Sequence, residues 1–279
     1  MSRPSPTVRR RRIAAELKRL REERGLTLDH AAKELGVARS TMSRMENAQV
    51  SVRPGDVRTL LELYGVEPDD VAALVQVARD ARQRGWWQTY SDVLPSWFEV
   101  YVGLEQAASE ISTFETALVP GLLQTADYAR RVIEAELPDA SPTEVDRRTE
   151  LRMKRQHDEA RPDLWVVLDE AVIRRVVGGA PTMRAQLERL ADEAESPGQT
   201  LQIVPFNAGA HASMISSFSI LTFPELADPP VAYLESRAGS LYVEGSGAHA
   251  YVRIFRILQA DALAPRASIE IVREAAKSM

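Results

Sequence analysis

The chain has 279 residues, enough for two domains, and its proportions of hydrophobic and charged residues are ordinary for a globular protein. It contains no cysteine, which excludes disulfides and thiolate zinc sites, and its four histidines lack metal-ligand spacing. No apolar run approaches the roughly 18 residues of a membrane span, and the first residues lack the apolar segment of a secretion signal. We therefore expect a cytoplasmic protein without a metal or other cofactor.

Charge is distributed unevenly along the chain. Residues 1–66 contain 14 Lys and Arg against 8 Asp and Glu, a net charge of +6. The rest of the chain contains 21 basic against 32 acidic residues, a net charge of −11. A basic segment ahead of an acidic one is compatible with nucleic-acid contact at one end of the chain, although a solvated arginine-rich surface gives the same count.

Helical periodicity dominates the first part of the chain, after residues 1–8, which we expect to be disordered. Gly25 and Gly36 are expected to end helices, Thr27 to cap one, and Pro54 to start one. These signals predict helices at 9–24, 28–35, 39–47, 54–64 and 69–84. Five helices joined by short loops predict a compact all-α domain over residues 9–84.

The third of these helices has two unlike faces. At about 100° per residue, Met42 and Met45 fall on one arc, whereas the opposite arc is polar and cationic. Such a helix, placed after a tight turn at Gly36, is suited to the major groove of DNA. The candidates for base contact are Arg39, Ser40, Ser43 and Arg44, and the candidates for phosphate contact are Arg21, Asn47, Arg53 and the run 9–12. A helical hairpin with a solvated face would show the same local pattern.

Aromatic residues are concentrated in residues 85–103, a stretch that holds three of the four tryptophans. Flexible linkers avoid tryptophan, so we interpret this stretch as a structured joint between two domains. An aromatic wall of a ligand pocket is the alternative interpretation.

Residues 104–279 combine helical and strand patterns. Helices are expected at 105–118, 126–137, 142–160, 170–177, 181–195, 251–263 and 269–279. Strands are expected at 164–168, 201–206, 218–223, 231–235 and 241–243, separated by Gly, Pro, Asp and Asn. The pattern predicts an α+β domain whose small sheet of about five strands is covered by helices.

Residues 9–66 resemble the Cro/repressor helix-turn-helix family, also called the Xre family, whose domains are lambda-repressor-like. The resemblance rests on Gly25-Leu26-Thr27, Leu35-Gly36-Val37 and Ser43-Arg44-Met45-Glu46-Asn47. It implies that the front of the third helix contacts bases, a role that falls here on Arg39, Ser40, Ser43 and Arg44. It also implies phosphate contacts from Arg21 and Asn47.

Three positions depart from the pattern of that family. Ala38 stands where a serine or threonine usually caps the recognition helix, and a missing cap costs about 1 kcal/mol. Ala48 replaces the usual glycine after Asn47, and Leu28 stands where glutamine is common.

Residues 85–279 resemble the WhiJ-like regulators of actinobacteria. The shared runs are GWW, VPGLLQTADYARRVI, LDEAVIRRVVGG, MRAQLERL and LQIVPFNAGAH. The resemblance implies a streptomycete-type transcription regulator with no established enzymatic activity. It also implies a gene that often lies beside one for a small partner protein, in an antitoxin-like arrangement. No residue of 104–279 inherits a role, because the ligand or partner of such domains is undefined.

No catalytic motif is present. We find no nucleophile elbow, HExxH motif, phosphate-binding loop or dinucleotide-binding glycine motif, so we expect no enzymatic activity and assign no catalytic residue. His211 follows an expected strand, where a ligand-sensing histidine can lie, although a structural histidine is the simpler interpretation.

These features together predict a sequence-specific transcription regulator that binds double-stranded DNA as a homodimer. Its C-terminal domain is expected to sense an unknown small-molecule effector or to bind a small protein encoded by an adjacent gene. The alternative is an antitoxin-like interaction protein that holds this partner and represses their shared promoter.

Overall fold

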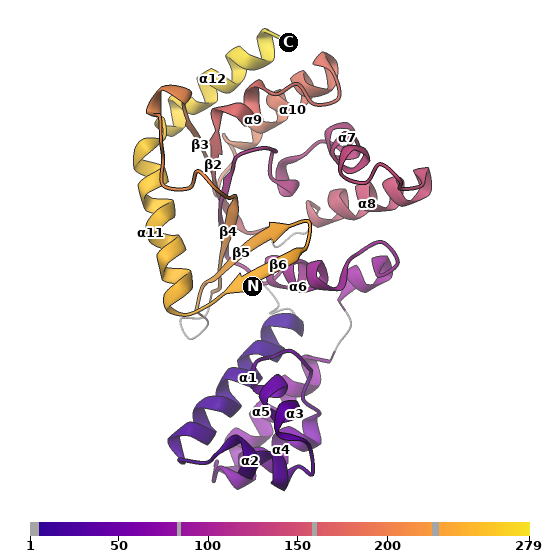
Figure 1. Cartoon of the computed structure of the whole chain (residues 1–279), viewed down its shortest axis with the longest axis vertical. Helices are drawn as coiled ribbons and strands as arrows, with labels where there is room; N and C mark the ends of the chain where they lie inside the picture. The colour runs from indigo at the N-terminus through magenta and orange to yellow at the C-terminus, as the bar shows by residue number, and fades with distance from the viewer. Residues whose placement is uncertain (1–5, 83–84, 158–160, 225–228) are drawn as a thin grey trace. The chain divides into compact units, whose positions relative to one another are not determined.

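The computed structural model describes residues 6–82, 85–157, 161–224 and 229–279, and it divides into two compact units (Figure 1). The N-terminal unit extends to Gln88, and the C-terminal unit runs from Thr89 to Met279. Within the described residues, no helix is both long enough and apolar enough to cross a membrane. The predicted order, an all-helical domain followed by an α+β domain, is confirmed.

The N-terminal unit contains the five predicted helices. They are α1 (Pro6–Glu23), α2 (Leu28–Glu34), α3 (Arg39–Glu46), α4 (Pro54–Leu63) and α5 (Pro68–Asp80). Residues 6–8 were expected to be disordered, but α1 begins at Pro6 and includes them. Proline suits this position because the first turn of a helix leaves its N–H groups unpaired within the helix, so none is lost. The remainder of the expected disordered segment, residues 1–5, lies outside the described residues.

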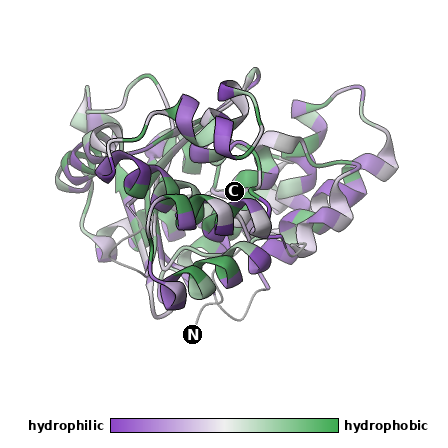
Figure 2. Cartoon of the chain, turned by 90° about the horizontal axis from the view of Figure 1, so that it is seen from below, coloured by the Kyte–Doolittle hydropathy of each residue, from purple (hydrophilic) through white to green (hydrophobic). Residues whose placement is uncertain are grey.

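One apolar stripe from each helix forms the core of the N-terminal unit. Leu17, Met42 and Leu61 are almost completely buried, and they come from α1, α3 and α4. Ala31 and Ala32 are also buried, and their small side chains allow α2 to approach its neighbours closely. In Figure 2, green and purple stretches alternate along the helices, as expected for helices that bury one side.

The C-terminal unit contains a mixed sheet and seven α-helices within its described residues. The helices are α6 (Ser96–Glu105), α7 (Ala126–Glu136), α8 (Pro142–Arg155), α9 (Glu170–Arg174), α10 (Ala180–Glu193), α11 (Ser246–Asp261) and α12 (Pro265–Lys277). Short 3₁₀ segments occur at Trp86–Tyr90, Gly121–Leu123 and Phe206–Ala208. The expected helix 142–160 corresponds to α8, which ends at Arg155.

The sheet has six strands in the order β3-β2-β1-β4-β5-β6. Its strands are β1 (Glu110–Glu115), β2 (Asp163–Asp169), β3 (Gln199–Val204), β4 (Phe218–Thr222), β5 (Val231–Ser236) and β6 (Gly239–Val243). Strands β1, β2 and β3 are parallel, with Phe114 opposite Val167, whereas β4, β5 and β6 continue the sheet antiparallel. The carboxyl ends of β1, β2 and β3 therefore share one edge.

The expected helix over residues 105–118 is wrong, because β1 lies within this segment. Ile111 and Phe114 are three residues apart, a spacing that a helix would also place on one face. In the structure β1 is a central strand between β2 and β4, and its polar residues Ser112 and Thr113 are buried as well. The Thr113 and Ser219 hydroxyls hydrogen-bond at 2.9 Å, which satisfies both polar groups inside the sheet.

Helices cover both faces of the sheet (Figure 1). Helix α11 packs on one face, where Phe255 and Leu258 contact Phe114 and Phe218 of the central strands. Helices α7, α8 and α10 lie on the other face, and α12 packs against α10 and the edge strand β3. The predicted covering of the sheet by helices is confirmed.

Candidate nucleic-acid interface

Helices α2 and α3 form a helix-turn-helix. Thr27 caps α2, since its Oγ1 accepts a hydrogen bond from the backbone N–H of His30 at 3.2 Å. Gly36 then adopts a left-handed φ of +65°, and the N–H of Val37 reaches back to the carbonyl of Ala32 at 2.9 Å. A residue with a Cβ atom adopts this φ only with strain, so glycine at position 36 fixes the turn.

The faces of α3 are distributed as the periodicity predicts. Met42 and Met45 are buried in the core of the N-terminal unit, which fixes the rotation of the helix about its axis. The predicted base-contact residues lie on the other side: Arg39, Ser40 and Arg44 are exposed, and Ser43 is half-buried. The structure therefore brings these four residues together on one helix surface.

An acidic residue accompanies Arg39. Arg39 is the first residue of α3, and its Nε atom lies 3.4 Å from Oδ2 of Asp29, near the start of α2. Both side chains are mostly exposed, at 66% for Arg39 and 72% for Asp29. The sequence showed no sign of this ion pair, because the two residues are ten positions apart in different helices.

Arg21, a predicted phosphate-contact residue, forms a buried ion pair in the structure. Its guanidinium is buried and donates to the Glu46 carboxylate, from Nε at 2.7 Å and from Nη2 at 2.8 Å. Nη1 donates to the backbone carbonyl of Leu26 at 2.7 Å. The hydrogen bonds to Glu46 raise the pKa of Arg21. These internal partners hold the Arg21 guanidinium inside the N-terminal unit, and its phosphate contact stays a prediction.

Glu46 is the buried partner of Arg21, and this pairing was not predicted from the sequence. It is 6% exposed, although it lies in a predicted polar run. Tyr64 lies close to the pair and is fully buried, and burial raises the pKa of its phenol to about 12. The signal that could have found Glu46 is the apolar stripe of α1, since Arg21 follows Leu17 by one helical turn and a buried cation needs an anion.

Of the other phosphate-contact candidates, Asn47, Arg53 and Arg12 are exposed, and residues 9–11 are half-buried. The Asn47 Nδ2 group donates to the carbonyl of Ser43 at 2.8 Å, so this amide closes the end of α3. Arg53 precedes the first residue of α4 and is exposed. Leu28, in contrast, packs partly buried against the core.

The two alanine departures are both visible in the backbone of α3. Ala38 occupies the N-cap with φ −68° and ψ 148°, and it makes no side-chain capping bond. Ala48 adopts φ +55°, alone among the described residues other than glycine in having a positive φ. The N–H groups of Ala48 and Gln49 bond to the carbonyls of Met45 and Arg44, which is the Schellman pattern that elsewhere takes glycine.

Aromatic side chains from the later part of the aromatic stretch, residues 89–103, pack within the C-terminal unit. Tyr101 is buried and its ring centroid lies 4.3 Å from that of Tyr233 in β5. Tyr90 donates a hydrogen bond to Glu150 of α8 at 2.8 Å. Arg147 of the same helix binds Asp92 through two nitrogens, at 2.8 and 3.0 Å. These contacts fasten the start of the C-terminal unit to its own helices.

His211 is held at the shared edge where the parallel strands end. Its side chain is 5% exposed, and Nε2 lies 3.6 Å from Oδ2 of Asp169. Its Nδ1 accepts the N–H of Ser213 at 3.3 Å, and its ring meets that of Phe114 edge-on at 5.2 Å. With these three contacts and little exposed surface, His211 has the surroundings of a structural histidine.

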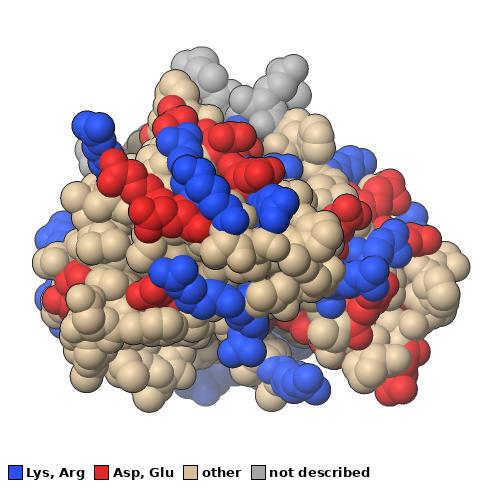
Figure 3. Space-filling view, turned by 90° about the horizontal axis from the view of Figure 1, so that it is seen from above, with Lys and Arg blue, Asp and Glu red and all other residues tan. Residues whose placement is uncertain are grey.

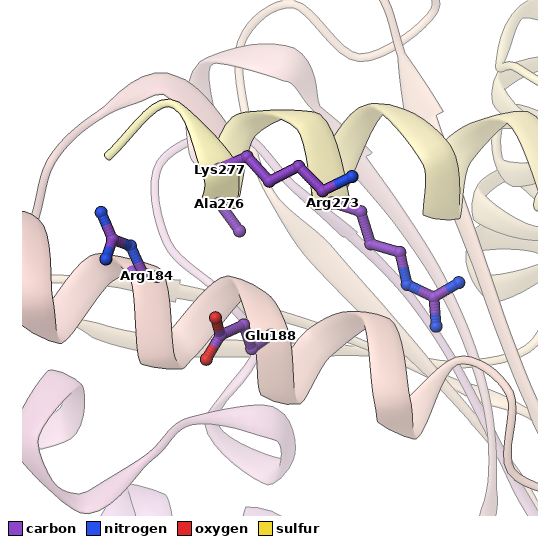
Figure 4. A pocket seen from close by; sticks show the side chains of 5 residues that line it. All are labelled: Arg184, Glu188, Arg273, Ala276 and Lys277. Carbon is purple, nitrogen blue, oxygen red and sulfur yellow. The ribbon is translucent and has the colours of Figure 1, made fainter.

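Charged side chains are mixed over the C-terminal unit. A shallow hollow of about 370 Å³ lies between α10 and α12, lined by Arg184, Glu188, Arg273, Ala276 and Lys277 (Figure 4). Arg273 is already paired with Glu195 at 2.9 Å. Figure 3 shows cationic and anionic groups interspersed on the face it draws. The hollow is lined by more cationic than anionic side chains, but it is open and gives a small ligand no apolar enclosure.

Comparison with known families divides the chain in the same way. Residues 12–74 match the family model described as helix-turn-helix domain. Residues 98–274 match the family model described as domain of unknown function (DUF5753). No curated protein and no solved structure matches the chain. The N-terminal unit is thus a DNA-binding helix-turn-helix domain by its geometry and by its family.

Proposed function

Because the chain belongs to the DUF5753 family and carries a helix-turn-helix domain ahead of that region, we propose that it is a sequence-specific transcription regulator. It binds double-stranded DNA as a homodimer, with one α3 in the major groove of each half-site. The C-terminal unit is then the part that responds to a signal. We propose no enzymatic activity for it.

The observation that carries this proposal is the exposed surface of α3. Arg39 and Arg44 project from a helix whose opposite side is fixed by buried Met42 and Met45. Two arginines on a rigid helix suit bidentate contact with O6 and N7 of guanine, the commonest specific contact in the major groove. Ser40 and Ser43 are proposed to add hydrogen bonds to bases or phosphates.

Asn47, Arg53 and the arginines at the start of α1 are proposed to contact phosphate. Such contacts position the protein on the duplex without selecting a sequence. We also propose that the N-terminal unit is of the Xre type and that the C-terminal unit is of the kind found in WhiJ-like actinobacterial regulators.

Selection of bound duplexes from a random pool by the full-length chain tests this proposal. We expect an enriched sequence, and a binding constant for it that falls steeply with salt as counterions are released. Arg39→Ala and Arg44→Ala should each weaken binding to that duplex by about 1–3 kcal/mol and relax the preference at one base pair.

Arg79→Ala is a matched control, since it removes one exposed arginine from α5 of the same unit. It should leave the base preference unchanged. Equal losses on selected and random duplexes for the α3 variants would contradict base contact by Arg39 and Arg44. A failure to enrich any sequence would contradict the function as a whole.

A second candidate function is an antitoxin-like role, in which the C-terminal unit holds a small protein. The loop before β4 supports it. Hydrogen bonds fix this loop, from Ser213 Oγ to the Ser216 carbonyl at 2.7 Å and from the Thr116 N–H to Ser217 Oγ at 3.1 Å. The same loop exposes Met214 by 61% and Ile215 by 98%. A fixed loop with exposed apolar side chains is typical of a protein-binding surface.

Isolation of the full-length chain from its native cell separates the two candidates. A stoichiometric small protein that is lost in an Ile215→Ser variant, with promoter binding intact, would support the antitoxin-like role. Promoter binding without any such partner would support the first candidate, a transcription regulator whose signal is a small-molecule effector.

A further inference from the structure

The ion pair between Asp29 and Arg39 joins the two helices of the DNA-binding motif. Arg39 begins α3, where a recognition helix comes closest to base edges, and Asp29 lies in the first turn of α2. The carboxylate meets Nε of the guanidinium at 3.4 Å. The closest approach to the carboxylate is made by Nε, so the terminal nitrogens Nη1 and Nη2 can still donate to acceptors on a base.

A carboxylate at this place is unfavourable for general attraction to DNA. Asp29 is 72% exposed, and a negative charge beside phosphates lowers affinity for every sequence. As a cap for α2 it is redundant, since Thr27 already accepts the His30 N–H. Two interactions favour a carboxylate here. The dipole of α2 stabilises an anion in its first turn, and the contact with Arg39 restricts an exposed arginine that otherwise samples many rotamers.

We infer that Asp29 is a positioning residue for base recognition: it holds the Arg39 guanidinium in one orientation and so sharpens the choice of one base pair. This inference rests on the proposed function. An exposed ion pair is too weak to matter for folding, but it restricts a flexible side chain before DNA arrives. Asp29 thereby lowers binding to random DNA and raises the preference for guanine opposite Arg39.

The test uses the full-length chain, the selected duplex, and duplexes in which each base pair is replaced in turn. In Asp29→Asn, we expect the preference at the Arg39 base pair to fall by about 3–10-fold, with the other base pairs unchanged. Affinity for random DNA should rise by about 2–5-fold at low salt, because one negative charge is removed.

A double-mutant cycle with Arg39→Ala distinguishes positioning from other roles. In the Arg39→Ala background, Asp29→Asn should no longer change the preference at any base pair. Glu34→Gln is the matched control, since it also removes an exposed charge from α2 and lies away from the pair. It should leave the preference of the wild-type chain unchanged.

Four results would overturn the inference. A loss of preference that persists in the Arg39→Ala background would show that Asp29 contacts a base itself, for example the N4 amino group of cytosine. A uniform change on all duplexes would show a purely electrostatic or structural role. Absence of any base preference in the wild-type chain would end both this inference and the proposed function, whereas a wild-type preference that Asp29→Asn leaves intact would end this inference alone.

Discussion

Ala48 has a backbone conformation that residues with a Cβ atom rarely adopt. Its φ of +55° costs an L-residue with a Cβ atom about 1–2 kcal/mol, and glycine avoids this cost but loses more entropy on folding. We expect Ala48→Gly to raise the free energy of unfolding of the N-terminal unit by about 0.5–1 kcal/mol. Native-state hydrogen exchange of the α3 amides in the full-length chain measures this change.

Gly36→Ala is the converse control for this prediction. Gly36 has φ +65°, and a Cβ atom there would meet nothing within 4 Å, so backbone strain is the only penalty. It should destabilise the unit by about 1 kcal/mol. An Ala48→Gly variant with unchanged or lower stability would show that Ala48 is not strained.

Glu115, at the end of β1, should make the C-terminal unit depend on pH. Hydroxyl groups of Thr113 and Ser217 contact the carboxyl, but burial dominates and raises its pKa to about 7. The folded state therefore holds more protons than the unfolded state between about pH 4.5 and 7, so its stability falls as pH rises through this window. We expect Glu115→Gln to remove this slope and to stabilise the unit at pH 8 by up to about 3 kcal/mol.

Urea unfolding of the C-terminal unit at pH 5 and pH 8 checks the expectation for Glu115. Glu188→Gln provides the comparison, since Glu188 is an exposed glutamate on α10 of the same unit. It should keep the wild-type slope. A wild-type unit equally stable at both pH values would refute the cause assigned to Glu115.

At the scale of elements, the buried pair of Arg21 and Glu46 connects α1 to the recognition helix. Removing one partner leaves a buried charge, so Glu46→Ala should destabilise the N-terminal unit by about 3–5 kcal/mol. Replacing both residues, as in Arg21→Met with Glu46→Leu, should recover most of this loss. Thermal unfolding of the wild type, Glu46→Ala and the double variant measures these stabilities. A small loss of stability in Glu46→Ala would mean that water reaches Arg21.

Elements with strong local signals were predictable from the sequence. Thr27 was predicted to cap a helix, and its hydroxyl accepts the N–H group of His30. The strands after β1 were also found, because turn residues separate them. Strand β1 was missed because its burial depends on β2 and β4, which no local pattern reveals.

The candidate nucleic-acid interface was predictable where it follows from local pattern and not where it depends on tertiary contacts. The surface of α3 follows from helical period, so Arg39 and Arg44 were placed correctly on its exposed side. The burial of Arg21 was not predicted, because it depends on the pair with Glu46, 25 residues away. Asp29 was missed for the same reason, since tertiary contact decides which charges face each other.

At the scale of the whole molecule, two units with separate hydrophobic cores should unfold separately. We expect two calorimetric transitions for the full-length chain. Ala48→Gly should shift the transition of the N-terminal unit, and Glu115→Gln should shift that of the C-terminal unit. A single transition shifted by both variants would show that the units are energetically one body.

The central place of β1 also sets the order of events during synthesis. Thr113 of β1 bonds to Ser219 of β4, which follows it by 106 residues. Ribosomes add about 5–20 residues per second, so roughly 5–20 s pass between the synthesis of β1 and that of its neighbour β4. The five helices before it need no later segment for their own core. A nascent chain can therefore carry a finished helix-turn-helix domain while the sheet of the C-terminal unit is still incomplete.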